Sequence, residues 1–328
     1  MIITRAPFRV SFCGGGSDIP SFYERYGGCV LSTTIRKYVY LTIHKSFLRD
    51  EITLKYSKTE VVNDPDKIEH RIFRQVLKDF GTRGVEITSM ADIPAGTGLG
   101  SSSAFTVALL KAMYTYNERF ASTYKIAKEA CEVEINRLGN PIGKQDQFAS
   151  AFGGLRYYEF QPDGFVKTEP IIMRHESFRK LEDSIMMFYT GAVHDANKIL
   201  KEQSRNLASE NSKINATKAL CEMTRELKKS FEANDIDALG DVLARSWEIK
   251  KGLASGISSS LIDNVYSRGI AAGARGGKLL GAGGGGFLLF YVPEEEKRRE
   301  VREALSDLIE MPIELDNSGV SVIFSNSL

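Results

Sequence analysis

The segment between an expected strand at residues 85–91 and an expected apolar helix at residues 102–116 is rich in glycine and serine. It reads Pro94-Ala95-Gly96-Thr97-Gly98-Leu99-Gly100-Ser101-Ser102-Ser103. Glycines allow positive φ and a close approach of the backbone, and the first N–H groups of a helix bind phosphate oxygens. The serines can cap the helix or offer hydroxyls to a metal or a phosphate. The segment therefore predicts a phosphate-binding loop.

Two common glycine motifs and a plain turn fit this segment less well. It does not match GxxxxGK[ST], and it lacks the final glycine of the dinucleotide fingerprint. A bare G-x-G would also suit a plain glycine turn before a serine helix cap. One proline, three spaced glycines and three serines at one junction favour phosphate binding over that turn.

Composition and charge exclude several classes of protein. The 328 residues suggest about two domains, and a net charge of +1 gives no global field to attract nucleic acid or an acidic membrane. No apolar run approaches the ~18 residues of a membrane span. The four scattered cysteines form no CxxC pair, which disfavours a disulfide framework or a structural zinc site. We expect a cytoplasmic protein with neither nucleic acid nor membrane as a partner.

Strands and helices are grouped rather than regularly alternating, which indicates an α+β fold. In the first half we expect strands at residues 2–12, 29–35, 37–44, 52–56 and 85–91, and helices at 66–80, 102–116, 122–138 and 144–152. The second half predicts strands at 184–189, 278–292 and 320–324, and helices at 197–207, 213–233, 236–252, 261–274 and 294–309. The pattern restarts near residue 165, which predicts domains at residues 1–165 and 166–328.

Three segments in a fixed order resemble motifs of the GHMP kinases, a superfamily that includes galactokinase, homoserine kinase and mevalonate kinase. The loop at residues 94–103 closely resembles their nucleotide-binding motif. Ala6-Pro7-Phe8-Arg9-Val10 through Gly16-Ser17-Asp18 resembles the N-terminal substrate motif, and Lys278-Leu279-Leu280-Gly281-Ala282-Gly283-Gly284-Gly285-Gly286-Phe287 resembles the C-terminal glycine motif. Alone, the last run would suit a β-bulge or a break in a strand.

The resemblance implies a two-domain kinase with its active site in the cleft between the domains. It implies an N-terminal ATP-binding domain like ribosomal protein S5 and a C-terminal ferredoxin-like α/β sandwich. The cofactors would be ATP and Mg²⁺, with residues 94–103 at the nucleotide and Gly283 and Gly284 closing beside the substrate. The sequence does not decide between a monomer and a homodimer.

Within this superfamily the sugar kinases are the most similar subgroup. Galactokinases carry a Glu-His pair just before the acidic end of the first motif, where this chain has Gly15-Gly16-Ser17-Asp18. That segment, Leu31-Ser32-Thr33-Thr34-Ile35 and Pro141-Ile142-Gly143-Lys144-Gln145-Asp146-Gln147 resemble the D-glycero-D-manno-heptose 7-phosphate kinases. These enzymes make sugar 1-phosphates for GDP-heptose and surface polysaccharide. The alternatives are a fucose, hexosamine or uronate 1-kinase, an isoprenoid-pathway kinase, and a catalytically silent nucleotide-binding regulator.

Glu134 falls within the apolar stripe of the expected helix at residues 122–138. A carboxylate that faces the core is costly unless it is paired or binds a metal, and the pattern alone leaves a buried salt bridge and a metal role equally open. The resemblance favours the metal role. Glu134 precedes Asp146 by twelve residues, as the magnesium-binding Glu precedes the catalytic Asp in galactokinase-like members, and Ser102 matches their second magnesium ligand.

Asp146 lies in the first turn of a short expected helix. Such a residue is commonly an acid stabilised by the helix dipole, but the resemblance makes Asp146 the catalytic residue that accepts the proton of the sugar hydroxyl or orients that hydroxyl. Phosphoryl transfer depends mainly on positioning and on charge neutralisation. A strand arginine is more often a surface charge, and an Asp after Gly-Ser is more often a turn former. By resemblance, Arg9 lies beside the catalytic Asp, and Asp18, with Gly15, Gly16 and Ser17, binds the sugar.

Lys144 is the expected ligand of a phosphate carried by the sugar. A dianion remote from the reacting hydroxyl requires Lys or Arg donors, and Lys144 stands in the catalytic segment where galactokinases have an apolar residue. It could instead be a solvated residue at the helix start, or contact the γ-phosphate of ATP. The chain also departs from related heptose kinases at His194, where they have Arg.

Overall fold

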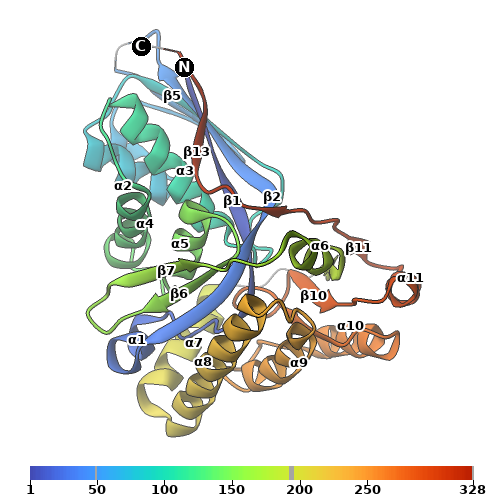
Figure 1. Cartoon of the computed structure of the whole chain (residues 1–328). Coiled ribbons are helices and arrows are strands. Elements are labelled where there is room, and N and C mark those ends of the chain that lie inside the picture. The colour runs from blue at the N-terminus through green and yellow to red at the C-terminus, as the bar shows by residue number, and fades with distance from the viewer. Residues whose placement is uncertain (49, 192–195, 327–328) are drawn as a thin grey trace.

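The computed structural model describes residues 1–48, 50–191 and 196–326, and two sheets organise this part of the chain (Figure 1). The first sheet has the strand order β13-β1-β2-β5-β3-β4, and every pairing in it is antiparallel except β3 with β5. β6 and β12 also pair with β2, and β7 pairs with β6. The bounds are β1 Ile2–Cys13, β2 Gly28–Lys45, β3 Ile52–Lys55, β4 Thr59–Val62, β5 Val85–Ala91, β6 Arg156–Phe160, β7 Val166–Pro170, β12 Leu315–Asp316 and β13 Ser321–Ser325.

The β1–β2 pair runs through the whole molecule and joins its two halves (Figure 1). The sequence predicts two strands over this range, and β2 is one strand with a bulge. Pro7 pairs with Tyr38 whereas the next residue, Phe8, pairs with Ile35, so Arg36 and Lys37 are extra residues on the β2 side. This bulge explains the apparent break in the sequence pattern.

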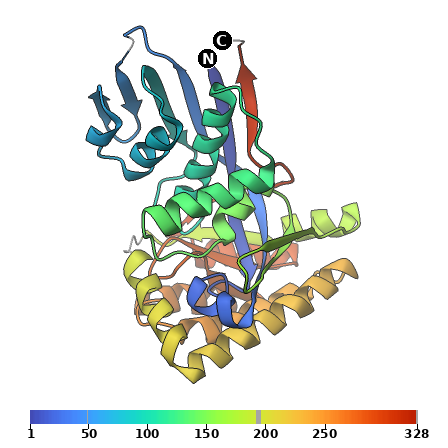
Figure 2. The same cartoon turned by 90° about the vertical axis from the view of Figure 1, so that its left-hand side faces the viewer.

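Helices cover one face of the first sheet (Figure 2). They are α1 Pro20–Tyr26, α2 Arg71–Phe80, α3 Ser101–Tyr116, α4 Thr123–Cys131 and α5 Gln145–Phe152, with a π-helical segment at Glu132–Arg137 after α4 and a 3₁₀ turn at Pro65–Lys67. α3 packs directly against β1 and β2. It is apolar around most of its circumference, as expected for a helix enclosed on all sides, with Leu109, Leu110 and Met113 fully buried.

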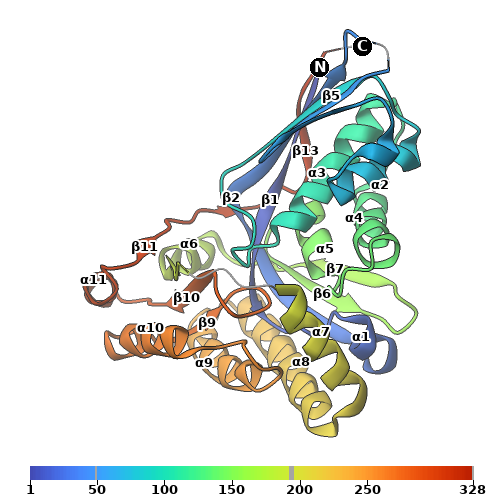
Figure 3. The ribbon, with the colours of Figure 1, turned by 180° about the vertical axis from the view of Figure 1, so that it is seen from behind.

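The second sheet has the order β11-β8-β10-β9 and is antiparallel. Its strands are β8 Ile185–Tyr189, β9 Gly276–Leu279, β10 Phe287–Tyr291 and β11 Ile309–Glu310. The accompanying helices are α6 His175–Asp183, α7 Ala196–Ser209, α8 Asn211–Glu232, α9 Ala238–Lys251, α10 Ser260–Ala271 and α11 Glu295–Ala304. α8 contacts β1 and β2, while α9 contacts β1 and β9, so these two helices join the halves (Figure 3).

The fold confirms the α+β prediction. The first sheet takes strands from both sides of residue 165, because β7 pairs with β6, β12 with β2 and β13 with β1. The boundary at that residue stays a prediction. No helix in the described ranges has the length and apolar character to cross a membrane, and all four cysteines are buried and free.

Candidate active site

The predicted phosphate loop is a turn in which three glycines hold left-handed conformations. Gly96, Gly98 and Gly100 have φ of 81°, 84° and 78°, which glycine adopts without a Cβ clash. The first helical hydrogen bond of α3 runs from Ala104 N to Gly100 O. The N–H groups of the preceding serines therefore precede the helical ladder and can bind oxygen ligands.

A cavity opens in front of this helix start, and we call it the nucleotide cavity. It is lined by Gly96, Gly98, Gly100, Ser101, Ser102 and Ser103, together with Gly281, Ala282, Gly283 and Gly285 of the second glycine run. Two other residues of the predicted loop, Pro94 and Leu99, do not line the cavity but accept hydrogen bonds through their carbonyls. Leu99 is buried and its carbonyl accepts from Arg9 N at 3.2 Å, and the Pro94 carbonyl accepts from Thr97 Oγ1 at 3.1 Å. Gly284 donates its N–H to Ile257 O at 3.0 Å.

The two glycine runs meet backbone to backbone. A Cβ on Gly98 would lie 2.6 Å from Leu280 O, and a Cβ on Gly281 would lie 2.5 Å from the Cα of Gly98. Gly281 also has a φ of 77°. Side chains at these positions would force the loops apart, so the glycines are required by the approach itself.

Arg9 and Asp146 form a two-point ion pair. Arg9 Nε donates to Asp146 Oδ1 at 2.8 Å and Nη2 donates to Oδ2 at 2.9 Å, while Nη1 donates to Gly98 O at 2.5 Å. The Arg9 side chain is 5% exposed and that of Asp146 is 23% exposed. Both line the nucleotide cavity and also a second, adjoining cavity. The pair thus stands where the two cavities meet, and Arg9 lies beside Asp146 as the resemblance predicted.

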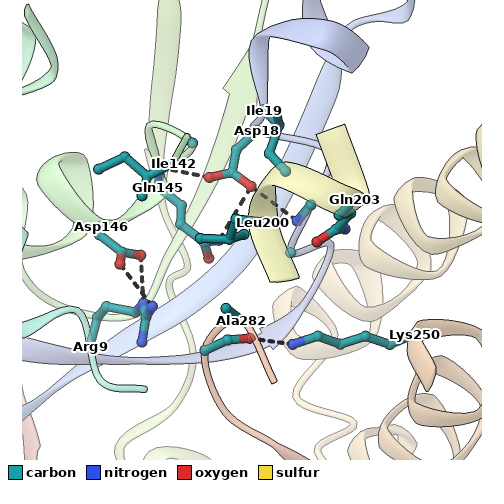
Figure 4. Close-up of a pocket in the computed structure, with 14 residues that line it drawn as sticks. Arg9, Asp18, Ile19, Ile142, Gln145, Asp146, Leu200, Gln203, Lys250 and Ala282 are labelled. Carbon is teal, nitrogen blue, oxygen red and sulfur yellow. Dashed lines mark hydrogen bonds and ion pairs between the residues drawn. The ribbon is translucent and has the colours of Figure 1, made fainter. Parts of the chain in front are cut away.

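The second cavity surrounds Asp18 (Figure 4), and we call it the sugar cavity after the role that the resemblance predicts for Asp18. Asp18 Oδ1 accepts from Gly16 N at 3.0 Å, and Oδ2 accepts from Gln145 N at 3.1 Å. Burial raises the pKa of the Asp18 carboxyl, and the Gln145 N–H opposes that effect. Gly15 and Gly16 line this cavity, whereas Ser17 faces away and donates to Gly14 O at 2.8 Å and to Cys29 O at 2.9 Å.

Two glutamines that the sequence analysis did not single out complete the sugar cavity. Gln145 Oε1 and Gln203 Nε2 are buried and have no hydrogen-bond partner within the described residues, and both side chains belong to the cavity lining. A buried polar atom without a partner is unfavourable. Hydroxyl groups of a bound sugar would satisfy one acceptor and one donor there.

Glu134 is fully buried, and its partners are neutral. Ser102 Oγ donates to Oε1 at 2.7 Å and Gln147 Nε2 donates to Oε2 at 2.8 Å. No Arg or Lys of the described chain forms an ion pair with it, so the salt-bridge alternative is wrong. Burial raises the pKa of the Glu134 carboxyl, and the hydrogen bonds from Ser102 and Gln147 oppose that rise. The two predicted magnesium ligands are thus hydrogen-bonded to each other.

The structure separates Lys144 from the sugar cavity. Its Nζ donates to Gly164 O at 2.9 Å and lies 4.4 Å from the centroid of the Tyr23 ring. It lines a different cavity together with Tyr23 and Asp163. Lys144 immediately precedes α5, and its side chain there turns toward the β6–β7 hairpin. His194 lies outside the described residues.

Lys250 takes a place in the sugar cavity that the sequence analysis missed. It continues the buried stripe of α9 formed by Leu239, Leu243 and Trp247. A charged residue on an apolar stripe is the same signal that identified Glu134, so the helical pattern could have revealed Lys250.

Comparison with known proteins identifies the class. The family model of the GHMP kinases N terminal domain matches residues 68–154, and that of the GHMP kinases C terminal region matches residues 225–310. The D-glycero-alpha-D-manno-heptose 7-phosphate kinase of Campylobacter jejuni is 30% identical over 294 residues, which cover 86% of each chain. The chain therefore belongs to the GHMP kinases.

Two further relatives narrow the class to sugar kinases. A solved structure described as a D-glycero-D-manno-heptose 1-phosphate kinase from Bacteroides thetaiotaomicron has a TM-score of 0.82 and 26% identity, and 100% of each chain is covered. The bifunctional fucokinase/GDP-fucose pyrophosphorylase of Arabidopsis thaliana is 26% identical over 96% of this chain and 32% of that protein. The protein is an ATP-dependent sugar kinase that transfers phosphate to a sugar hydroxyl.

Proposed function

We propose that the enzyme transfers the γ-phosphate of ATP to the anomeric C1 hydroxyl of D-glycero-D-manno-heptose 7-phosphate and forms the 1,7-bisphosphate. The observation that carries this proposal is the Arg9–Asp146 pair, which lines both the nucleotide cavity and the sugar cavity. A sugar hydroxyl beside Asp146 would face a terminal phosphate held at the start of α3. The similarity to the Campylobacter heptose kinase supports the choice of sugar.

These contacts support a role for each residue. Asp146 accepts the hydroxyl proton or orients the hydroxyl, and Arg9 holds the Asp146 carboxylate in place through two hydrogen bonds. Asp18, Gln145 and Gln203 bind sugar hydroxyls. The N–H groups that open α3 bind phosphate oxygens and stabilise the charge that develops during transfer.

Ser102 and Glu134 are the residues that would hold Mg²⁺. Magnesium is commonly bound through one or two carboxylates with the substrate phosphates and water, and a hydroxyl next to one buried carboxylate at the phosphate loop fits that pattern. The described residues contain no group of three or more His, Cys, Asp or Glu side chains able to form a metal cage. A bound ion would neutralise phosphate charge there.

Phosphorus NMR of the product formed from ATP and heptose 7-phosphate tests the proposal. We expect a new anomeric phosphate signal with proton coupling to C1–H, and the original 7-phosphate signal should persist. Product phosphorylated at another hydroxyl would contradict the proposal.

The second candidate is a 1-kinase for another sugar, such as fucose, a hexosamine or a uronate, and the fucokinase relative favours it. An ADP-release assay across a sugar panel distinguishes the candidates by kcat/KM. ADP release with none of these sugars would contradict both candidates.

A further inference from the structure

Lys250 is a buried lysine with spare hydrogen-bonding capacity. Its side chain comes from the last turn of α9 and is 7% exposed. Figure 4 shows its ammonium pointing toward the segment of Ala282, and Nζ donates to Gly281 O at 2.5 Å. An ammonium carries three N–H donors, and this is its single hydrogen bond to a described residue.

The charges around Lys250 are unbalanced. The nearby Arg9 is already paired with Asp146, and the Asp18 oxygens accept hydrogen bonds from Gly16 and Gln145. No carboxylate in the described ranges forms an ion pair with Lys250. Burial lowers the pKa of the Lys250 ammonium well below the usual lysine value; the charges of Lys278 and Arg9 lower it further, while those of Asp18 and Asp146 oppose this effect. Burial thus disfavours the charged form of Lys250, and a bound anion would stabilise that form.

We propose that Lys250 binds the phosphate group that the sugar substrate itself carries. The inference rests on the proposed function, because it gives the 7-phosphate of the heptose a partner that Lys144 does not supply. A lysine ammonium recognises a phosphate as a point charge with several donors. The Lys250 side chain could bind this phosphate from its present position in the sugar cavity, through the ammonium N–H groups that have no partner among the described residues.

The phosphoryl group that ATP transfers is the other phosphate that Lys250 could bind. Lys250 lines the sugar cavity and is absent from the described lining of the nucleotide cavity. The phosphate carried by the sugar is therefore the favoured ligand.

The test compares kcat and KM for heptose 7-phosphate and for the unphosphorylated heptose at saturating Mg-ATP. Lys250→Met should raise KM for the 7-phosphate at least tenfold, about 1.4 kcal/mol, and change KM for the unphosphorylated sugar less than twofold. Lys250→Arg, which keeps the charge, should restore KM for the 7-phosphate to within about threefold of the wild type. Lys250→Gln serves if the Met variant does not fold.

Lys251→Met is the matched control. Lys251 follows Lys250 at the end of α9, but its Nζ pairs with Glu248 Oε1 at 2.8 Å and it lines neither cavity. It should leave KM for the 7-phosphate within twofold. Lys144→Met should also leave that KM within twofold.

Three results would overturn the inference. Equal KM increases for both sugars would make the effect structural, and a fall in kcat for both sugars at unchanged KM would assign Lys250 to the transferred group. An unchanged KM in Lys250→Met, in a wild-type enzyme that prefers the 7-phosphate, rejects the inference alone. A wild-type enzyme that uses only unphosphorylated sugars rejects the proposed function as well.

Discussion

Asp146 and Glu134 are two carboxylates near the phosphate loop, and their surroundings differ in burial and in charge. Asp146 lines both cavities and is held by a cation, through two hydrogen bonds from Arg9. Glu134 is fully buried behind the phosphate loop and is held by the neutral groups of Ser102 and Gln147. The first arrangement compensates the negative charge of Asp146. The second disfavours a negative charge on Glu134 unless a cation binds beside it.

The difference between Asp146 and Glu134 shows that burial alone does not define the role of an acidic residue. Glu134 is more buried than Asp146, yet Ser102, its hydrogen-bond donor, is the residue that reaches the cavity. Asp146 itself lines both cavities. We therefore expect loss of Asp146 to affect turnover most and loss of Glu134 to affect the magnesium requirement.

The largest effect should follow from Asp146→Asn. We expect turnover to fall by ~10²–10⁴, the range for a positioned acid or base, while the Kd of ATP changes only a few-fold. ADP release and calorimetric ATP binding measure the two quantities. Asp183→Asn, an exposed substitution at the end of α6, is the control. A correctly folded Asp146→Asn enzyme with near wild-type turnover would remove Asp146 from the mechanism.

Arg9→Met tests whether the ion pair also stabilises the fold. It leaves the Asp146 carboxylate without its cation, and we expect a loss of about 2 kcal/mol of unfolding free energy. This lies below the range for a fully buried pair, because the Asp146 side chain is 23% exposed and solvent screens it. Urea unfolding of Arg9→Met, Asp146→Asn and the double variant should give a coupling of about 1 kcal/mol. Strict additivity would mean that the two side chains stabilise the protein independently.

Glu134→Gln removes one charged ligand without breaking an ion pair. We expect the magnesium concentration for half-maximal rate to rise about three- to tenfold, with no loss of stability greater than about 1 kcal/mol at pH 7. Magnesium titrations of the initial rate measure the effect. Glu132→Gln, in the same π-helical segment and 42% exposed, should leave the titration unchanged. A change in thermal stability with an unaltered magnesium titration would give Glu134 a purely structural role.

The smallest effect concerns pH and the stability of the metal-free protein. Burial raises the pKa of Glu134 in the folded state, so above about pH 4.3 the unfolded chain releases a proton that the folded chain retains. Wild-type stability should therefore fall, relative to Glu134→Gln, by up to about 1.4 kcal/mol per pH unit, until the folded-state carboxyl also ionises. Melting temperatures of both proteins from pH 4 to pH 8, with EDTA, measure the difference. A constant difference across this range would contradict the raised pKa.

The sequence predicted those parts of the site that are contiguous or follow a regular pattern. The loop at residues 94–103 was predicted from its composition, and the buried position of Glu134 from the helical period. The pairing of Arg9 with Asp146 came from the family resemblance, since 137 residues separate them. The direction in which the Lys144 side chain points depends on the turn before α5, and a residue pattern does not encode that turn.

Short polar elements were missed because tertiary contacts stabilise them. α1 has seven residues, too few to be stable alone, and it is fixed by burial of Phe22 and Tyr23. β7 and α6 bury little of their surface, so their apolar pattern is weak. The contact between Gly98 and Gly281 could not be predicted from the sequence either, because it joins two segments that are far apart in the chain.

That contact also limits how the protein can evolve. Many damaging substitutions in a protein core are rescued by a smaller residue on the opposite side of the contact. At the seam between the glycine runs, the facing positions of Gly98 and Gly281 are already the smallest residue available. A genetic screen for suppressors of Gly98→Ala should therefore yield true revertants at the codon itself and few second-site rescues within the opposing loop. Among related sequences we therefore expect no correlated change in size or chemistry at residues 98 and 281.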